Sequence, residues 1–187
     1  MRVVAGRLRG RRLLAPEGRD VRPTSDRARQ AVFNIIEHGG LAASPLDGAN
    51  VIDAFAGTGA LGIEALSRGA THCTFVEKER AALAALERNL DALGLKGAAR
   101  IMRSDVPSLP PATAQAAFAF LDPPYGENLA ASALDALARR GWLAQGALCI
   151  VELGARDDFA PPPGFTPLDD RRYGAARIAF LRYDGRE

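Results

Sequence analysis

The feature that most constrains the fold is a regular alternation, from residue 50 onward, between short apolar runs and segments with helical periodicity. The apolar runs have the length of buried strands and lie at residues 50–56, 71–77, 99–104, 116–121 and 147–153. Crossover connections of this kind are right-handed and place helices on both faces of a parallel sheet. Residues 166–173 and 176–183 predict a closing hairpin. The pattern therefore predicts an α/β fold with a mostly parallel seven-stranded sheet.

The first 40 residues precede this alternation and form a different pattern. Residues 2–5 and 8–14 flank a Gly6-Arg7 turn and predict a short basic hairpin. A helix is expected to begin after Pro23 and to end before Gly39. The expected apolar stripe of this helix consists of Ala28, Ala31, Val32, Ile35 and Ile36. We expect residues 1–40 to form a small unit that packs on a main domain of residues 41–187.

Positive charge is concentrated near the N-terminus. Residues 1–30 contain nine arginines and three acidic residues, whereas the rest of the chain contains 15 basic and 19 acidic residues. A basic arm on a mildly acidic body is typical of proteins that contact phosphate groups. The alternative interpretation is an arm that serves only solubility.

Length and composition narrow the class of protein. With 187 residues, of which 48% are hydrophobic and 25% charged, the chain fits one globular domain. No apolar run is long enough to span a membrane, and no secretory signal is apparent, so a cytoplasmic protein is expected. Cys73 and Cys149 lie far apart in apolar segments. Their spacing is not that of metal ligands, and no metal site is expected.

A glycine-rich turn follows the first predicted strand. Gly57, Gly59 and Gly62 match the pattern G-x-G-x-x-G, in which glycines allow a tight turn and a close approach of the backbone to a ligand. Glu77 ends the second predicted strand, where a carboxylate can bind both hydroxyls of a ribose. These features suit a nicotinamide dinucleotide as well as S-adenosylmethionine.

Acidic residues at successive strand ends favour S-adenosylmethionine. Asp53 would repel a pyrophosphate at the helix N-terminus, whereas it can hold the sulfonium and ammonium groups of S-adenosylmethionine. Asp105 follows the third strand and can accept a hydrogen bond from an adenine amino group. Taken singly, each has an equally good alternative interpretation: Asp53 as a turn carboxylate, Glu77 as a solvated charge and Asp105 as a helix cap. Their occurrence at three successive strand ends favours a site for the methyl donor.

The strongest indication of chemistry is Asp122-Pro123-Pro124-Tyr125, directly after the fourth predicted strand. Exocyclic amines of nucleic-acid bases are poor nucleophiles because their lone pair is delocalised into the ring. The Asp122 carboxylate and the Pro123 carbonyl can accept the amine hydrogens, and the two prolines hold these acceptors rigidly. Tyr125 offers an aromatic face on which a base can stack. The alternative interpretation is a proline-terminated strand followed by a turn.

These motifs resemble those of the bacterial 16S rRNA guanine-N2-methyltransferases of the RsmD type. The resemblance covers nearly the whole chain and is carried by R-V-V-A-G-x-x-R-G-R-x-L-x-x-P, R-P-T-S-D-R-A-R-Q-A-V-F-N, D-A-F-A-G-T-G-A-L-G-I-E-A-L-S-R-G-A, L-D-P-P-Y and G-W-L-A-x-x-A-L-C-I-V-E. One difference is Gln30, where the family more often has glutamate. Because Arg27 and Arg29 are retained, we expect this difference to have little consequence.

The resemblance implies a Rossmann-like class I methyltransferase fold and transfer of a methyl group from S-adenosylmethionine to a guanine N2 in small-subunit ribosomal RNA. The expected partner is this RNA, free or in a partly assembled particle, and a monomer is expected. The implied catalytic residues are Asp122, Pro123, Pro124 and Tyr125. The implied donor-binding residues are Asp53, Phe55, Ala56, Gly57, Thr58, Gly59, Glu77, Lys78, Ser104, Asp105 and Asp122. The arginines expected to contact RNA are Arg2, Arg7, Arg9, Arg11, Arg12, Arg22, Arg27 and Arg29.

Three other functions compete with this one. A DNA adenine-N6-methyltransferase shares both motifs but usually brings a target-recognition domain, for which no stretch of this chain is long enough. A nicotinamide oxidoreductase explains the glycine-rich turn but leaves residues 122–125 without a role. A non-catalytic RNA-binding module explains the arginines but does not need a donor site.

Overall fold

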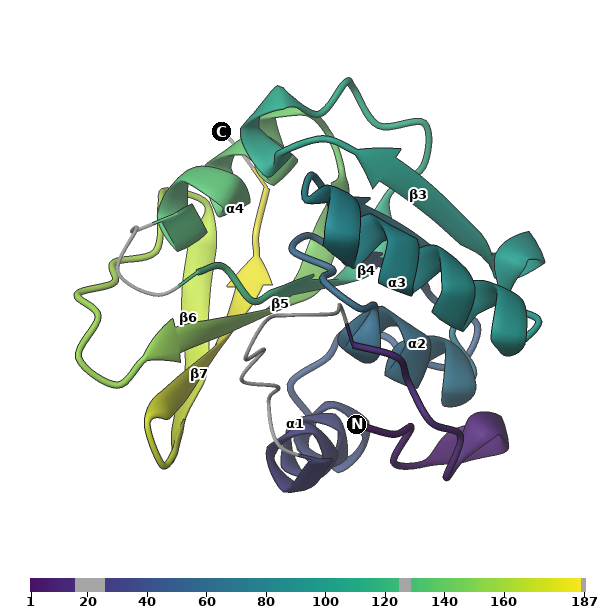
Figure 1. Ribbon diagram of the computed structural model, residues 1–187. Helices are drawn as coiled ribbons and strands as arrows, with labels where there is room; N and C mark the ends of the chain where they lie inside the picture. The colour runs from purple at the N-terminus through teal and green to yellow at the C-terminus, as the bar shows by residue number, and fades with distance from the viewer. Residues whose placement is uncertain (16–25, 125–128, 186–187) are drawn as a thin grey trace.

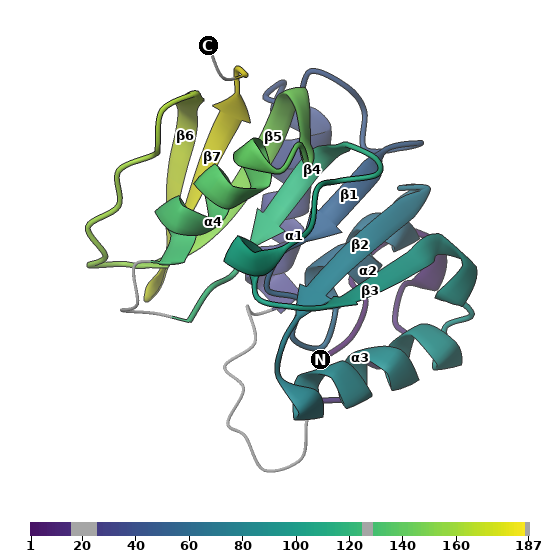
Figure 2. The same cartoon turned by 90° about the horizontal axis from the view of Figure 1, so that it is seen from above.

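The computed structural model describes residues 1–15, 26–124 and 129–185 and contains a seven-stranded sheet (Figure 1). The strands are β1 (Asn50–Asp53), β2 (His72–Glu77), β3 (Ala99–Arg103), β4 (Ala116–Leu121), β5 (Leu143–Gly154), β6 (Phe165–Tyr173) and β7 (Ala176–Tyr183). Their order across the sheet is β3-β2-β1-β4-β5-β7-β6, which can be followed from one side to the other in Figure 2.

Parallel pairing of the first five strands positions the loops that matter for function. β1 pairs in parallel with β2 and β4, β2 with β3, and β4 with β5. Only β7 runs antiparallel, between β5 and β6. The carboxyl ends of five strands therefore meet at one edge of the sheet, where open α/β sheets bind ligands. This topology confirms the predicted Rossmann-like class I methyltransferase fold.

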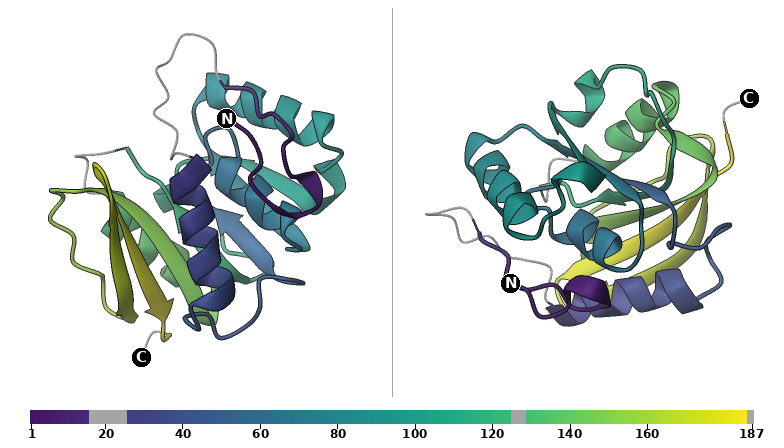
Figure 3. Two further views of the ribbon diagram at one scale, coloured as in Figure 1. Left: turned by 90° about the horizontal axis from the view of Figure 1, so that it is seen from below. Right: turned by 90° about the vertical axis from the view of Figure 1, so that its right-hand side faces the viewer.

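Helices cover both faces of the sheet, as predicted. They are α1 (Asp26–His38), α2 (Ala60–Ser67), α3 (Arg80–Ala92) and α4 (Leu129–Arg139). The first three contribute to one apolar core, with α1 lying along the sheet in the left view of Figure 3, and α4 packs on the opposite face. No described helix is long and apolar enough to cross a membrane.

The buried face of α1 differs from the predicted stripe. Ala31 and Ile35 are only half-buried, whereas Phe33 is fully buried. The Phe33 ring lies 5.4 Å from that of Phe120 in β4, and the guanidinium of Arg68 lies 4.8 Å above it. Phe33 thus packs between the sheet and the end of α2. The sequence of α1 alone gives no information about these partners.

The N-terminal hairpin has less regular structure than predicted, because it is held by side chains of the main domain. A single antiparallel bridge joins Arg2 and Arg12 around a short 3-10 helix, Gly6–Leu8. The backbone N–H groups of Val4 and Ala5 donate to the carboxylate of Glu64 in α2, at 2.8 and 2.9 Å. Glu64 is fully buried, so this contact anchors the hairpin to the domain.

Arg29 belongs to the same buried network, which corrects its predicted role as an RNA contact. Its side chain is 1% exposed and donates to Asp26 at 2.8 Å and to the carbonyl of Arg2. Its Nε lies 3.7 Å from Glu64. Because burying an arginine is tolerated only when its charge is paired, Arg29 serves to join α1, α2 and the hairpin and offers no surface to a phosphate.

Candidate active site

A cleft of about 560 Å³ lies at the carboxyl edge of the parallel strands. Its walls come from the loops after β1, β2, β3 and β4 and from the start of α4. Of the predicted donor-binding residues, the cleft is lined by Phe55, Gly57, Thr58, Glu77, Lys78, Ser104, Asp105 and Asp122. Asp53, Ala56 and Gly59 lie behind this surface and do not line it.

The three glycines of the motif after β1, of which Gly62 lies in α2, are needed for different structural reasons. Gly57 has a φ of +54°, and a Cβ added there would meet no heavy atom within 4 Å, so its backbone faces open cleft. A Cβ on Gly59 would lie 2.4 Å from Leu86, and one on Gly62 would lie 2.4 Å from Phe75. Only Gly57 therefore leaves room for a ligand, whereas the other two allow close packing of α2 on its neighbours.

Asp53 supports the loop from inside the protein. Its side chain is 1% exposed, and Oδ2 accepts a hydrogen bond from the Gly62 N–H at 2.9 Å. Oδ1 is buried and has no hydrogen-bond partner among the residues that the structure describes. Burial raises the pKa of Asp53 to about 7, the Gly62 N–H opposes that rise, and the negative charge of Glu77 adds to it. A positive charge in the nearby cleft would stabilise the ionised form.

Glu77 joins the ends of β2 and β1. One carboxylate oxygen accepts the N–H of Gly57 at 2.8 Å, and the other accepts those of Lys78 and Glu79, each at 2.8 Å. The side chain is half-buried and lines the cleft. It therefore shapes the glycine loop in addition to presenting a charge to the cleft, a structural task that sequence reasoning missed.

The opposite wall of the cleft follows β3. The Ser104 hydroxyl donates to the carbonyl of Asp105 at 2.8 Å, and Asp105 is exposed at the start of a 3-10 helix, Val106–Ser108. Val106 and Pro107 also line the cleft, although the sequence had not singled them out. An apolar pair beside an acidic side chain is suited to a flat ring with an amino group at its edge.

Asp122 lies directly after β4, on the floor of the cleft. Burial raises its pKa well above the usual range, and the negative charges of Glu152 and Asp53 raise it further. Perturbed carboxyl groups in clefts are typical of functional sites. Pro123 and Pro124 follow it along the cleft wall. Tyr125, the last residue of the motif, lies outside the described residues.

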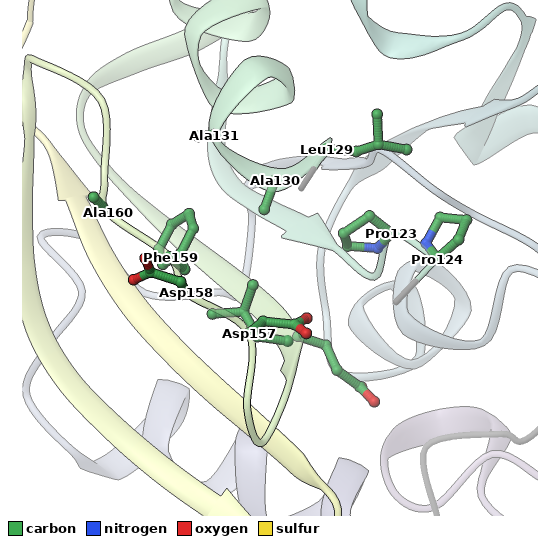
Figure 4. Close-up of a pocket in the computed structure, with 11 residues that line it drawn as sticks. Pro123, Pro124, Leu129, Ala130, Ala131, Asp157, Asp158, Phe159 and Ala160 are labelled. Atoms are coloured by element: carbon green, nitrogen blue, oxygen red, sulfur yellow. The ribbon is translucent and has the colours of Figure 1, made fainter. Parts of the chain in front are cut away.

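A smaller hollow of about 50 Å³ adjoins the cleft and shares Pro123, Pro124 and Leu129 with it. Figure 4 shows the two prolines on one side of this hollow and Asp158 and Phe159 on the other. Glu152, near the end of β5, also lines it. The Asp-Pro-Pro segment therefore separates two concave surfaces, of which only the larger can hold a nucleoside-sized molecule.

Most of the arginines that are expected to contact RNA lie at the surface. Arg2, Arg7, Arg9, Arg11 and Arg12 are exposed, as is Arg27 in α1, whereas Arg22 lies outside the described residues.

Asn89 in α3, which sequence reasoning missed, makes the connection between hairpin and cleft. Its amide exchanges hydrogen bonds with the backbone of Leu14, at 2.7 and 3.1 Å, and donates to the carbonyl of Thr58 at 3.0 Å. The end of the hairpin is thereby fixed beside the glycine loop. Its signal in the sequence is a polar residue within the leucine-rich face of α3.

Comparison with known proteins agrees with this architecture. The family model described as "Conserved hypothetical protein 95" matches residues 1–182. The Ribosomal RNA small subunit methyltransferase D of Escherichia coli K12 is 35% identical over 184 residues, which cover 98% of this chain and 89% of that protein. The protein of the same name from Haemophilus influenzae is 34% identical over 178 residues, which cover 93% of this chain and 89% of that protein.

Solved structures show the same relationship. The structure of yhhF from Escherichia coli has a TM-score of 0.82 and 32% identity and covers 100% of this chain and 99% of its own. The match extends from the N-terminal hairpin to the closing strands. The chain therefore belongs to the family described as conserved hypothetical protein 95, which includes the Ribosomal RNA small subunit methyltransferase D proteins.

Proposed function

We propose that this protein transfers a methyl group from S-adenosylmethionine to the exocyclic N2 amine of a guanine in small-subunit ribosomal RNA. The observation that carries the proposal is the position of Asp122, Pro123 and Pro124 at the floor of a nucleoside-sized cleft, at the carboxyl ends of parallel strands. Two relatives that are similar to this chain over most of its length are named as ribosomal RNA small subunit methyltransferases, which supports ribosomal RNA as the substrate.

The residues of the cleft fit S-adenosylmethionine. Because glycine has no Cβ, Gly57 leaves space for a ligand against the backbone of the loop. Glu77 and Asp105 present carboxylates to the cleft from two neighbouring strand ends. A ribose next to Glu77 and an adenine next to Asp105, Val106 and Pro107 match these surfaces in polarity. The bound donor supplies an electrophilic methyl group on a positively charged sulfur. That charge matches the acidic patch formed by Asp53 and Asp122, whose pKa values are both raised.

Asp122 and Pro123 would hold the amine that receives the methyl group. The carboxylate of Asp122 and the carbonyl of Pro123 accept the two amine hydrogens, which turns the nitrogen lone pair out of conjugation and toward the cleft. Proline fixes φ, so Pro123 and Pro124 hold these acceptors without further ordering when the substrate binds. After transfer the methylated amine is acidic, and its proton can leave to Asp122 or to water.

The first test concerns donor binding by Glu77. Replacing it with alanine would leave three loop N–H groups without their acceptor, so Glu77→Gln, which keeps one acceptor oxygen, is the better variant. Loss of charge-assisted hydrogen bonds to the ribose, worth about 1.5–3 kcal/mol, should weaken S-adenosylmethionine binding roughly tenfold to hundredfold. Calorimetric titration measures this, and Glu87→Gln on the exposed face of α3 is the matched control. Unchanged affinity in Glu77→Gln would remove Glu77 from the donor site.

The second test concerns the arginines of the hairpin. Deleting the hairpin would expose the apolar core around Val3 and Leu13, so substitution is preferable. Changing Arg7, Arg9 and Arg12 together to glutamine should flatten the salt dependence of RNA binding by a slope of roughly 2, since each phosphate contact to single-stranded RNA contributes about 0.7. Affinity for S-adenosylmethionine should not change.

A triple variant of exposed arginines elsewhere provides the control for the hairpin. Arg140 follows α4, and Arg171 and Arg172 lie in β6, far along the sheet from the hairpin. Changing these three to glutamine removes the same charge and should leave the slope unchanged. Equal slopes in both triple variants would show that the hairpin is only a solvated surface.

The third test concerns the chemistry at Asp122. Asp122→Ala should keep donor and RNA binding but lose about a hundredfold or more in single-turnover rate, a typical loss for one preorganised polar group. Asp122→Asn keeps an oxygen that can accept one amine hydrogen. We expect it to retain measurable activity, because orientation of the amine requires an acceptor and not a base. Single-turnover rates with saturating donor and unmodified small-subunit rRNA decide whether Asp122 orients the amine or removes its proton as a general base, because a general base would leave Asp122→Asn nearly as inactive as Asp122→Ala. A fully active alanine variant would contradict the whole assignment of the site.

A further inference from the structure

Glu152 stands beside Asp122 at the carboxyl edge of the sheet. β4 and β5 are parallel and pair Leu121 with Val151, so continuing the register by one residue places Asp122 next to Glu152. Paired residues of neighbouring strands leave the same face of a sheet, and the strands lie about 4.8 Å apart. Glu152 is 7% exposed, and its negative charge acts on Asp122 strongly enough to raise the pKa of that carboxyl group. Two carboxyl groups therefore lie side by side at a position that is largely shielded from solvent.

The neighbours of Glu152 within the sheet are apolar. Val151 and Leu153, before and after Glu152 in β5, are buried and apolar, and its partner across the sheet is Ile178, which is also buried. Ile150, on the same face two residues earlier, belongs to the apolar core. The negative charge of Glu152 disfavours ionisation of the neighbouring Asp122 and raises its pKa. Adjacent carboxyl groups of which one perturbs the other at a cleft are candidates for recognition.

Glu152 reaches the site from the side opposite the glycine loop. It lines the small hollow together with Pro123 and Pro124, whereas Asp122 lines the large cleft. The hollow is much smaller than the cleft, so it can admit only the edge of a base. A base whose amine is held at Asp122, with its nitrogen facing the cleft, would therefore have a neighbouring ring atom near Glu152.

The ring atom next to the amine distinguishes guanine from the other bases. In guanine the carbon that bears the N2 amine lies between ring N3, which accepts, and ring N1, which carries a hydrogen and donates. In adenine and cytosine the exocyclic amine is adjacent to a ring nitrogen that carries only a lone pair and accepts. An ionised carboxylate is an acceptor only, so it binds the first arrangement and repels the second.

We propose that Glu152 selects guanine by accepting the hydrogen of ring N1 while Asp122 accepts a hydrogen of the N2 amine. This inference rests on the proposed function and assigns a specificity-determining residue to it. The adjacent carboxyl groups can meet the adjacent N1–H and N2–H groups of guanine, with Asp122 on the side of the cleft and Glu152 on the side of the small hollow. Sites that are built around a substrate hydrogen-bond donor reject analogues that lack it far more strongly than apolar pockets reject a missing methylene.

The test compares guanine with 2-aminopurine, which keeps the 2-amine but has no hydrogen on N1. Unmodified small-subunit rRNA is prepared by ligation with either base at the position that the wild-type protein methylates. The measured quantity is the ratio of kcat/KM for the two RNAs, in the wild type, in Glu152→Gln and in the matched control Glu87→Gln. Because one protein sample is used for both RNAs, any loss of folded protein cancels in the ratio. Affinity for S-adenosylmethionine is measured as an independent check on the donor site.

We expect the wild type and Glu87→Gln to prefer guanine by about a hundredfold or more, and Glu152→Gln to lose at least tenfold of that preference. The glutamine amide can rotate and donate to the bare N1 of 2-aminopurine, which a carboxylate cannot do. Donor affinity should stay within about twofold in all three proteins. A role of Glu152 only in folding or in the pKa of Asp122 would lower both rates together and leave the ratio unchanged.

The outcomes separate this inference from the proposed function. A high ratio in the wild type that Glu152→Gln leaves unchanged would overturn the inference alone, as would a wild type that does not distinguish the two bases. A wild type that forms no N2-methylguanosine on either the free RNA or the reassembled small-subunit particle would overturn both.

Discussion

The parallel register of β1, β4 and β5 determines the electrostatics of the whole site. It brings Asp53, Asp122 and Glu152 to one edge of the sheet, where each side chain is buried or half-buried. Burial raises the pKa values of Asp53 and Asp122. The charge of Glu77 adds to the rise at Asp53, and the charges of Glu152 and Asp53 add to that at Asp122, so full ionisation of this patch is unfavourable without a nearby positive charge. A cationic donor in the adjoining cleft would supply that charge. Donor binding and ionisation of the acceptor side are therefore expected to support each other.

The second constraint is the attachment of the N-terminal hairpin to the domain. Glu64 accepts two hairpin N–H groups, and Asn89 joins Leu14 to the carbonyl of Thr58 in the glycine loop. The hairpin is thus fixed through its backbone, which leaves most of its arginine side chains at the surface. Arg2 also pairs with Asp26, and Arg11 donates to the carbonyl of Ala92. Arg7, Arg9 and Arg12 are therefore the hairpin arginines best placed for the proposed contacts with RNA phosphates.

The sequence was sufficient to predict a mostly parallel seven-stranded sheet, and it placed the candidate residues at strand ends, which share one edge in such a sheet. It was not sufficient to predict which residues of a motif face the cleft. Gly59 and Gly62 are needed because Leu86 and Phe75 pack against them, and these contacts join segments far apart in the chain. Arg29 looked like one more surface arginine, but its partner Glu64 lies 35 positions away in α2. Glu152 belongs to no motif in the sequence, and only the strand register places it beside Asp122.

The central proposal is that a guanine N2 in small-subunit rRNA is the methyl acceptor. Mass mapping of methylated nucleosides in rRNA from cells with and without the gene tests this claim without assuming how the RNA is presented. We predict that one N2-methylguanosine is lost from small-subunit rRNA when the gene is deleted, that it returns with the wild-type gene, and that it does not return with Asp122→Ala. Identical methylation maps with and without the gene, or loss of a methyl group from an adenine or cytosine instead, would contradict the account.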